Sequence, residues 1–189
     1  MLRTELRNAL IASVFLMVTA CASTPTAVMD FDPGFNFSAI KTISILPLNR
    51  SVSSIADISD IQAARMNETL GNELTRRGYS VVEDPATADL LLTWHLVTQE
   101  RTDVRTYNTM SARYSSCWNC PRGAGMSTQN VSVRQFTQGT LIADMIDPAA
   151  MQSVWRSIFE ARLRDLDPEE AEEKRRSVAE ALFAEFPPQ

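Results

Sequence analysis

The chain of 189 residues carries 23 acidic and 18 basic side chains, so its formal net charge is −5 at pH 7. A negatively charged protein repels the phosphate backbone, which argues against nucleic acid as a partner. The length suits one domain with its own core, and the absence of an internal repeat argues against a solenoid.

The first 20 residues have the pattern of an export signal. Arg3 and Arg7 give a positive start, and an uncharged, largely apolar run follows over residues 9–20. As a helix this run would span about 18 Å, well short of the roughly 30 Å core of a bilayer. We therefore predict a cleaved signal peptide over residues 1–20 rather than a membrane span, and its removal makes the net charge one unit more negative.

The end of that run, Val18-Thr19-Ala20-Cys21, resembles the lipobox of bacterial lipoproteins: an aliphatic residue, two small residues and a cysteine. Small side chains let the segment enter the peptidase cleft, and the thiol accepts the lipid. We predict cleavage between Ala20 and Cys21. The resemblance implies three acyl chains, such as palmitate, on Cys21, and two or more chains anchor a protein stably.

The residues after Cys21 bear on where the protein is held. By the same resemblance, an aspartate next to the cysteine would retain the protein at the inner membrane, but Ala22 stands there. We therefore predict the periplasmic face of the outer membrane, with the inner membrane as the alternative. Residues 21–27 form a short lipidated tether. The six residues after Cys21 reach at most about 20 Å, so the expected partners are lipid headgroups and other envelope proteins.

The mature domain, residues 28–189, begins in our interpretation with two strands and a helix. Residues 28–31 and 40–47 alternate apolar and polar side chains, as half-buried strands do. Ser59 begins a capping box ahead of a helix over about residues 60–77, which Gly78 ends. On the buried face of this helix we expect Ile61, Ala64, Leu70 and Leu74.

Four more strands and a second helix follow, and Asp167 is the expected N-cap of that helix. Gly139, inside a strand, indicates a bulge, and residues 108–130 form a long loop. The expected ranges are 79–82, 90–107, 131–146 and 154–163 for the strands, and about 168–186 for the helix. The order β-β-α-β-β-β-β-α predicts an α+β domain, a largely antiparallel sheet with both helices on one face.

A set of short fragments lies in order along the mature domain. They are Asp30-Phe31-Asp32, Phe37-Ser38, Lys41-Thr42, Arg77-Gly78-Tyr79, Ala88-Asp89-Leu90, Gly139-Thr140-Leu141-Ile142, Val154-Trp155-Arg156 and Phe186-Pro187. In these fragments the chain resembles a family of uncharacterised bacterial lipoproteins, known as domain of unknown function 4136. The resemblance covers essentially the whole mature domain, and it implies no established activity and no catalytic residue.

No constellation in the sequence indicates an enzyme, a cofactor or a metal site. The one histidine, His95, lies in mid-strand without a flanking Ser or Cys motif, and no G-x-S-x-G occurs. Turn formation accounts for Asp144 and Asp147. At the start of the last helix, solvent exposure and the helix dipole account for Glu169, Glu170, Glu172 and Glu173.

Cys117 and Cys120 are the one place where an enzymatic interpretation survives. For two nearby thiols in the periplasm the default is a disulfide, which in so short a loop contributes about 2 kcal/mol in the chain-entropy model. The alternatives are a redox-active pair, a metal site and separate free thiols. A redox pair would open a helix in a βα unit, and a metal site needs two further soft ligands.

The segment from Glu100 to Arg134 is locally positive, at +3, although the protein is acidic. Its five arginines are Arg101, Arg105, Arg113, Arg122 and Arg134, interleaved with Tyr107, Tyr114 and Trp118. We interpret them as a contact for anionic headgroups or for a partner protein, and the alternative is an ordinary solvated loop. The sequence thus favours a non-enzymatic envelope binding or assembly accessory. The alternatives are a thiol–disulfide protein and a lipid-binding transport accessory.

Overall fold

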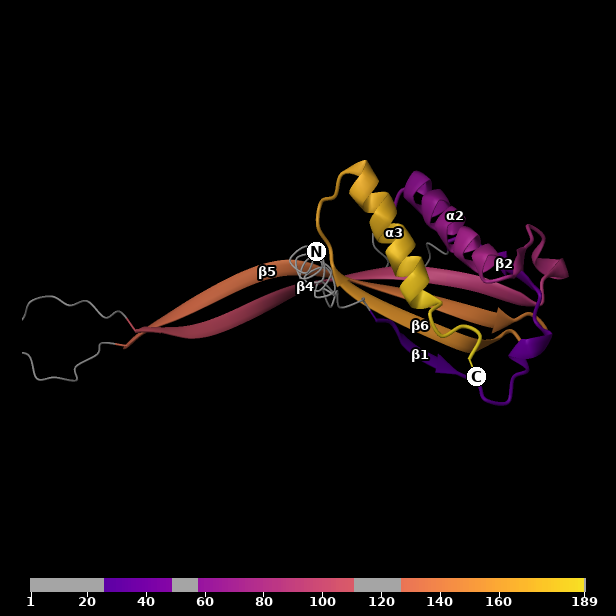
Figure 1. Cartoon of the computed structure of the whole chain (residues 1–189), viewed down its shortest axis with the longest axis horizontal. Coiled ribbons are helices and arrows are strands. Elements are labelled where there is room, and N and C mark those ends of the chain that lie inside the picture. Colours follow the sequence, from indigo (N-terminus) through magenta and orange to yellow (C-terminus); the bar gives the residue numbers. More distant parts are fainter. Residues whose placement is uncertain (1–25, 49–57, 111–126, 189) are drawn as a thin grey trace, which may run out of the picture.

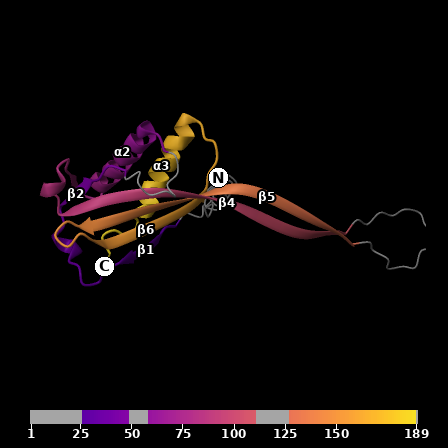
Figure 2. The same ribbon diagram turned by 180° about the vertical axis from the view of Figure 1, so that it is seen from behind.

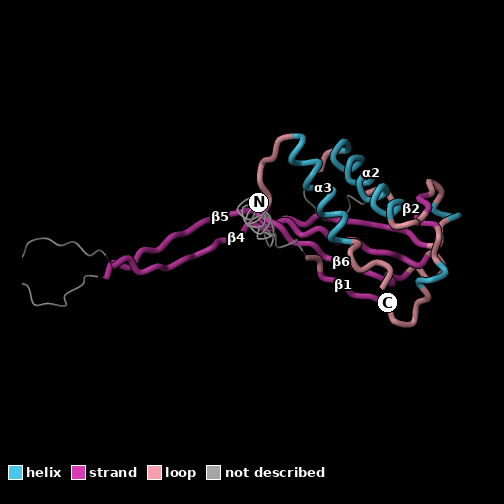
Figure 3. Tube along the Cα trace, viewed as in Figure 1, coloured by secondary structure: helices cyan, strands magenta, loops and turns pink. Residues whose placement is uncertain are grey.

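The computed structural model describes residues 26–48, 58–110 and 127–188, and a six-stranded sheet is its centre. Two helices, α2 (Asp60–Arg76) and α3 (Pro168–Leu182), lie over the same face of that sheet (Figure 1). The view from behind shows both helices on that same side of the sheet, as does the trace coloured by secondary structure, so neither α2 nor α3 lies on the opposite face (Figures 2 and 3). The strands are β1 (Val28–Phe31), β2 (Thr42–Ile45), β3 (Ser80–Val81), β4 (Leu90–Met110), β5 (Ser127–Asp147) and β6 (Gln152–Arg162).

The sheet is mixed, with the strand order β1-β6-β5-β4-β2-β3. The pairs β1–β6, β6–β5 and β5–β4 are antiparallel, whereas β2 pairs in parallel with both β4 and β3. The α+β class, with six strands and two helices, is therefore confirmed, but the sheet is not purely antiparallel. The parallel part arises because α2 forms a crossover between β2 and β3, which brings the chain back in the same direction. Two short 3-10 helices, η2 (Phe37–Ala39) and η3 (Pro85–Thr87), add to the expected order.

The core lies between the sheet and the two helices. Alternate side chains of β4, β5 and β6 point into it, as the period of two predicts. Trp155 stacks on Phe183 with ring centroids 5.7 Å apart, and Phe186 meets Trp155 edge-on at 5.0 Å. Trp94 donates from Nε1 to Asn67 Oδ1 on α2 at 2.7 Å. The largest fully buried apolar side chains are Trp94, Trp155, Phe183, Ile43, Leu70, Leu74, Leu90, Leu92, Met145 and Leu182.

The ends of α2 agree with prediction, but part of its buried face was predicted wrongly. Ser59 Oγ accepts from the backbone N–H of Gln62, and the Gln62 side chain accepts from the N–H of Ser59. Ile61, however, is 65% exposed and Ala64 is also exposed, whereas Ala63, Leu70, Glu73 and Leu74 are buried. At about 100° per residue, Ile61 lies on the side of the helix opposite Leu70.

Asp89 ties the start of β4 to β2. Its Oδ2 accepts from the backbone N–H groups of Lys41, at 2.9 Å, and Thr42, at 2.8 Å. These two hydrogen bonds, with a third from the Thr42 hydroxyl, hold the pKa of Asp89 below its ordinary value. The carboxylate thereby fixes the junction of the parallel strands.

Gly139 is not at a bulge, contrary to expectation. It pairs in regular register with Thr98 and Ala161, and the irregularity between β5 and β6 lies at Met145/Ile146 instead. A Cβ at Gly139 would lie 2.7 Å from Leu163 Cδ2. The glycine at position 139 leaves room for the Leu163 side chain, and it does not mark a bulge.

Two glycines of the α2 region predict opposite effects of the same substitution. Gly78 follows the helix with φ +95°, where an L side chain is strained, so Gly78→Ala should lower the free energy of unfolding by about 1 kcal/mol. Gly71 lies within α2, and a Cβ there would meet Ile45 Cδ1 at an ordinary 3.5 Å. Gly71→Ala should therefore raise that free energy by about 0.5–1 kcal/mol. Urea unfolding measures both, and equal signs would contradict the assignment.

Candidate functional site

The most distinctive feature of the structure is an arm formed by β4 and β5. These strands pair over twenty rungs, from Leu91 opposite Ile146 to Met110 opposite Ser127. The last rung of β6 joins Arg162 to Gln138, so beyond it β5 has only β4 as a neighbour. The two-stranded ribbon projects from the body of the domain (Figure 1). At about 3.3 Å per residue, the eleven residues Glu100–Met110 give it a length of roughly 36 Å.

The arm is longer than expected because a segment predicted as loop is strand. Residues 108–110 and 127–130 were assigned to a loop over 108–130, yet they extend both strands of the arm. These residues are mostly polar and show no alternation that would predict a strand, but each pairs with a residue of the neighbouring strand. The expected strand over 90–107 is confirmed and extended.

One face of the arm, which we call the arginine face, contains Arg101, Arg105, Arg134, Tyr107 and Phe136. Along each strand, successive side chains point to opposite faces, and these residues all occupy positions on one face. This face is continuous with the side of the sheet that carries neither α2 nor α3. Arg162 of β6 lies over the Phe136 ring, with Cζ 3.9 Å from the centroid. Asp103 accepts from Arg105 Nε at 3.1 Å and from an Arg162 NH2 group at 3.4 Å.

The opposite face of the arm, the valine face, exposes three valines. Val104 and Val133 stand directly opposite each other, and Val131 lies two rungs nearer the tip on the same face. Their exposed fractions are 58%, 60% and 60%. At the root of this face, the Thr137 hydroxyl donates to Glu100 Oε1 at 2.6 Å. Sequence reasoning missed this face, although Val131-Ser132-Val133-Arg134 does alternate.

On the side of the sheet without helices, a polar row crosses four strands: Thr93, Asp144, Arg156 and Asp30 stand in register. Arg156 donates to both Asp144 oxygens, from Nε at 2.7 Å and from an NH2 group at 3.1 Å. The Ser153 hydroxyl donates to Asp144 Oδ1 at 2.9 Å. The hydrogen bonds and the charge of Asp144 raise the pKa of Arg156.

This row corrects one of the two aspartate assignments. Asp147 does form a turn, because its Oδ1 accepts from the N–H of Ala149 at 2.9 Å. Asp144 does not: it is buried, and its carboxylate is neutralised by the Arg156 fork on the neighbouring strand. Both Asp144 oxygens accept hydrogen bonds from neighbouring side chains, so we interpret the Asp144–Arg156 pair as a structural ion pair.

His95 lies beside this row, half-buried and opposite Ile142 on β5. Its Nδ1 has no hydrogen-bond partner within the described residues. Within the same ranges, no three His, Cys, Asp or Glu side chains are placed to hold one metal ion. None of the helices in the part of the chain that the structure covers is long and apolar enough to cross a membrane.

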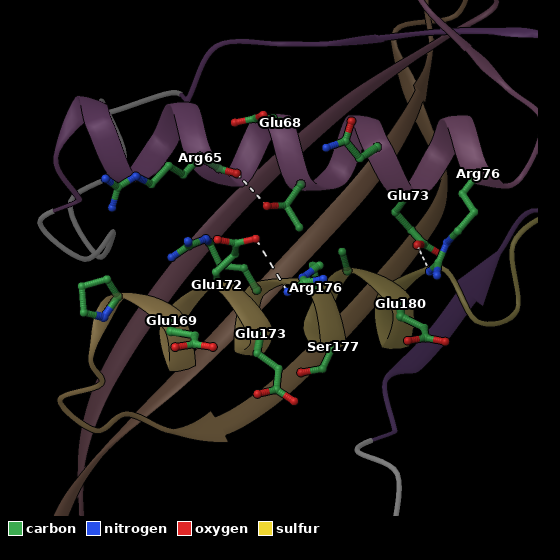
Figure 4. Close-up of a pocket in the computed structure, with 15 residues that line it drawn as sticks. Arg65, Glu68, Glu73, Arg76, Glu169, Glu172, Glu173, Arg176, Ser177 and Glu180 are labelled. Carbon is green, nitrogen blue, oxygen red and sulfur yellow. Dashed lines mark hydrogen bonds and ion pairs between the residues drawn. The ribbon is translucent and has the colours of Figure 1, made fainter.

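A groove of about 860 Å³ runs between α2 and α3 (Figure 4). Glu169, Glu172 and Glu173, which were expected to face solvent, are exposed along it. Arginines on both helices offset them in part. Arg176 forms an ion pair with Glu172 at 3.6 Å, and the buried Glu73 forms ion pairs with Arg76 and Arg77. A ligand pocket is normally enclosed and mostly apolar, whereas this groove is a charged, water-facing seam between helices.

The predicted site residues divide into two sets. Arg101, Arg105 and Arg134 come together on the arginine face. The other predicted site residues, which are Ala20, Cys21, Arg113, Cys117, Cys120 and Arg122, lie outside the described residues. The predicted disulfide, cleavage and lipidation therefore stay predictions.

Comparison with known proteins gives a family and several solved structures. Residues 27–188 match the family described as Domain of unknown function (DUF4136), whereas no curated protein matches the chain. A PDZ domain protein from Parabacteroides distasonis has a TM-score of 0.47 and 16% identity, over 87% of this chain and 36% of that one. The chain thus spans about a third of that protein.

Two further solved structures are similar in length to this chain. A DUF4136 family protein from Bacteroides thetaiotaomicron has a TM-score of 0.46 and 14% identity, over 86% of this chain and 94% of that one. The PelC dodecamer from Paraburkholderia phytofirmans has a TM-score of 0.44 and 11% identity, over 82% and 95%.

Proposed function

Because the chain belongs to the DUF4136 family, a domain of unknown function, we propose its role from its own geometry: a lipid-anchored, non-enzymatic accessory of the bacterial envelope. Through the valine face of the arm it binds another envelope protein and serves in binding or assembly. It faces the periplasm from the outer membrane, held by acyl chains on Cys21.

The observation that carries this proposal is the exposed valine row at the end of a projecting ribbon. Val104, Val131 and Val133 are each more than half exposed on a ribbon without a core of its own. Two-stranded ribbons are marginally stable in water, so such an arm adds little to the stability of the domain. Burying a valine against a partner contributes about 1.5 kcal/mol or more, so three valines favour a contact.

The anchor and the arm are compatible in space. Val28, the first residue of β1, is in register with Ile158, Ile142 and His95, close to the rungs where the arm leaves the sheet. The chain therefore enters the domain at the root of the arm (Figure 1). A tether attached to Cys21 would hold that end, and with it the arm, beside the membrane and its resident proteins.

Photo-crosslinking in intact envelopes tests the partner. A benzophenone amino acid at Val133 should give a discrete crosslinked product to another protein. The matched control is the same amino acid at Ile61, which is 65% exposed but lies on α2 rather than on the arm, and which should not give that product. Val104→Ser with Val131→Ser should reduce the Val133 product. Identical products from Val133 and Ile61 would contradict a specific contact on the valine face.

A further inference from the structure

The arm has a second, chemically different face, and we infer that its arginines bind the anionic phospholipid headgroups of the membrane that holds the protein. This inference rests on the anchor at Cys21 proposed above. It concerns Arg101, Arg105 and Arg134 on the arginine face, on the opposite side of the ribbon from the valines.

The charges of this face are only partly neutralised within the described residues. Asp103 is its one acidic side chain along the ribbon, and it accepts from both Arg105 and Arg162. Arg101 and Arg134 form no ion pair with another residue that the structure describes, although Arg134 stands opposite Asp103 in the ladder. On a protein with a net charge of −5, this local excess of positive charge attracts external anions.

The aromatic side chains on the same face fit a lipid surface. Tyr107 is 55% exposed between the arginines and the tip of the arm, and Phe136 underlies Arg162 at the root. Tyrosine combines an apolar ring with a polar tip, which favours the boundary between headgroups and acyl chains. Arginine guanidinium groups form paired hydrogen bonds with phosphate oxygens. The face therefore combines side chains suited to both layers of a membrane surface.

The attachment of the chain supplies the geometric support. From Cys21 to Val28, where β1 begins, seven residues reach at most about 23 Å. The arm is longer than this, at roughly 36 Å, and it starts at the same end of the sheet. An anchored domain thus keeps its arm within reach of the bilayer, where the arginine face can lie along the headgroups.

Vesicle binding by the mature chain, which lacks residues 1–20, tests this inference, with Cys21→Ser in every variant so that no acyl chain contributes. Vesicles contain either phosphatidylcholine alone or 30% phosphatidylglycerol. A basic residue near an anionic surface contributes roughly fivefold to binding, so Arg101→Gln with Arg134→Gln should weaken binding to the anionic vesicles about 25-fold. The matched control, Arg65→Gln with Arg176→Gln on the helices, changes the net charge equally and should alter binding less than twofold.

Each outcome decides the inference. Binding that needs phosphatidylglycerol, falls on raising the salt concentration and is lost in the arm variant supports it. Equal binding of the arm and helix variants, or equal binding to both vesicle compositions, overturns it. If the arm variant instead changes only protein crosslinks in envelopes, the arginine face contacts a protein and the inference is wrong. Acylation of Cys21 is measured separately, so a failure here leaves the proposed anchor untouched.

Discussion

Arg156→Ala should lower the free energy of unfolding by about 2–3 kcal/mol, a large effect for a side chain that is 52% exposed. The reason is the partner that it leaves behind. Asp144 has a side chain only 6% exposed, and it would keep a single hydrogen bond, from Ser153. A buried carboxylate without its cation is costly, and the gap left by the arginine admits water that limits the loss.

Two variants separate this mechanism from a simple loss of packing. Arg162→Ala removes an equally exposed arginine of β6, whose longer contact with Asp103 should be worth about 1 kcal/mol or less. Adding Asp144→Asn to Arg156→Ala removes the stranded charge and should restore part of the stability. Urea unfolding measures all three, and a double variant less stable than Arg156→Ala would contradict the argument.

The sequence predicted those parts of the fold that rest on local signals. Ser59 with Gln62 and Asp167 identified the starts of both helices, because capping side chains satisfy backbone N–H groups a few residues away. Alternation along residues 90–107 and 154–163 predicted the strands β4 and β6. Such signals lie within a few residues of the element that they describe.

Features that depend on distant partners escaped prediction. Asp144 resembles a turn residue until β6 brings Arg156 beside it, twelve positions along the chain. Glu73 resembles a solvent-facing helix residue until Arg77 covers it. The parallel pairing of β2 and β4 depends on the path of α2 across the sheet, which periodicity within one element does not encode.

The candidate site was predicted in part, for a similar reason. The positive balance over residues 100–134 drew attention to Arg101, Arg105 and Arg134, but strand pairing was needed to place them on one face. Pairing also placed Val104 directly across from Val133, a contact between residues 29 positions apart. Composition shows that the charges are present, and the register of β4 with β5 shows which side of the arm they occupy.

Fatty-acid labelling of Cys21→Ser is the most direct test of the account, because both proposals depend on the anchor. The thiol is the only atom of the lipobox that can accept diacylglycerol, so its removal should abolish labelling completely. Cells fed an alkyne fatty acid should label the unchanged protein and hold it in the membrane fraction. Cys117→Ser with Cys120→Ser is the matched control and should keep full labelling. We expect an unlabelled Cys21→Ser protein, present as unprocessed precursor or as a slowly cleaved soluble form. Labelling equal to that of the unchanged protein would contradict the lipid anchor.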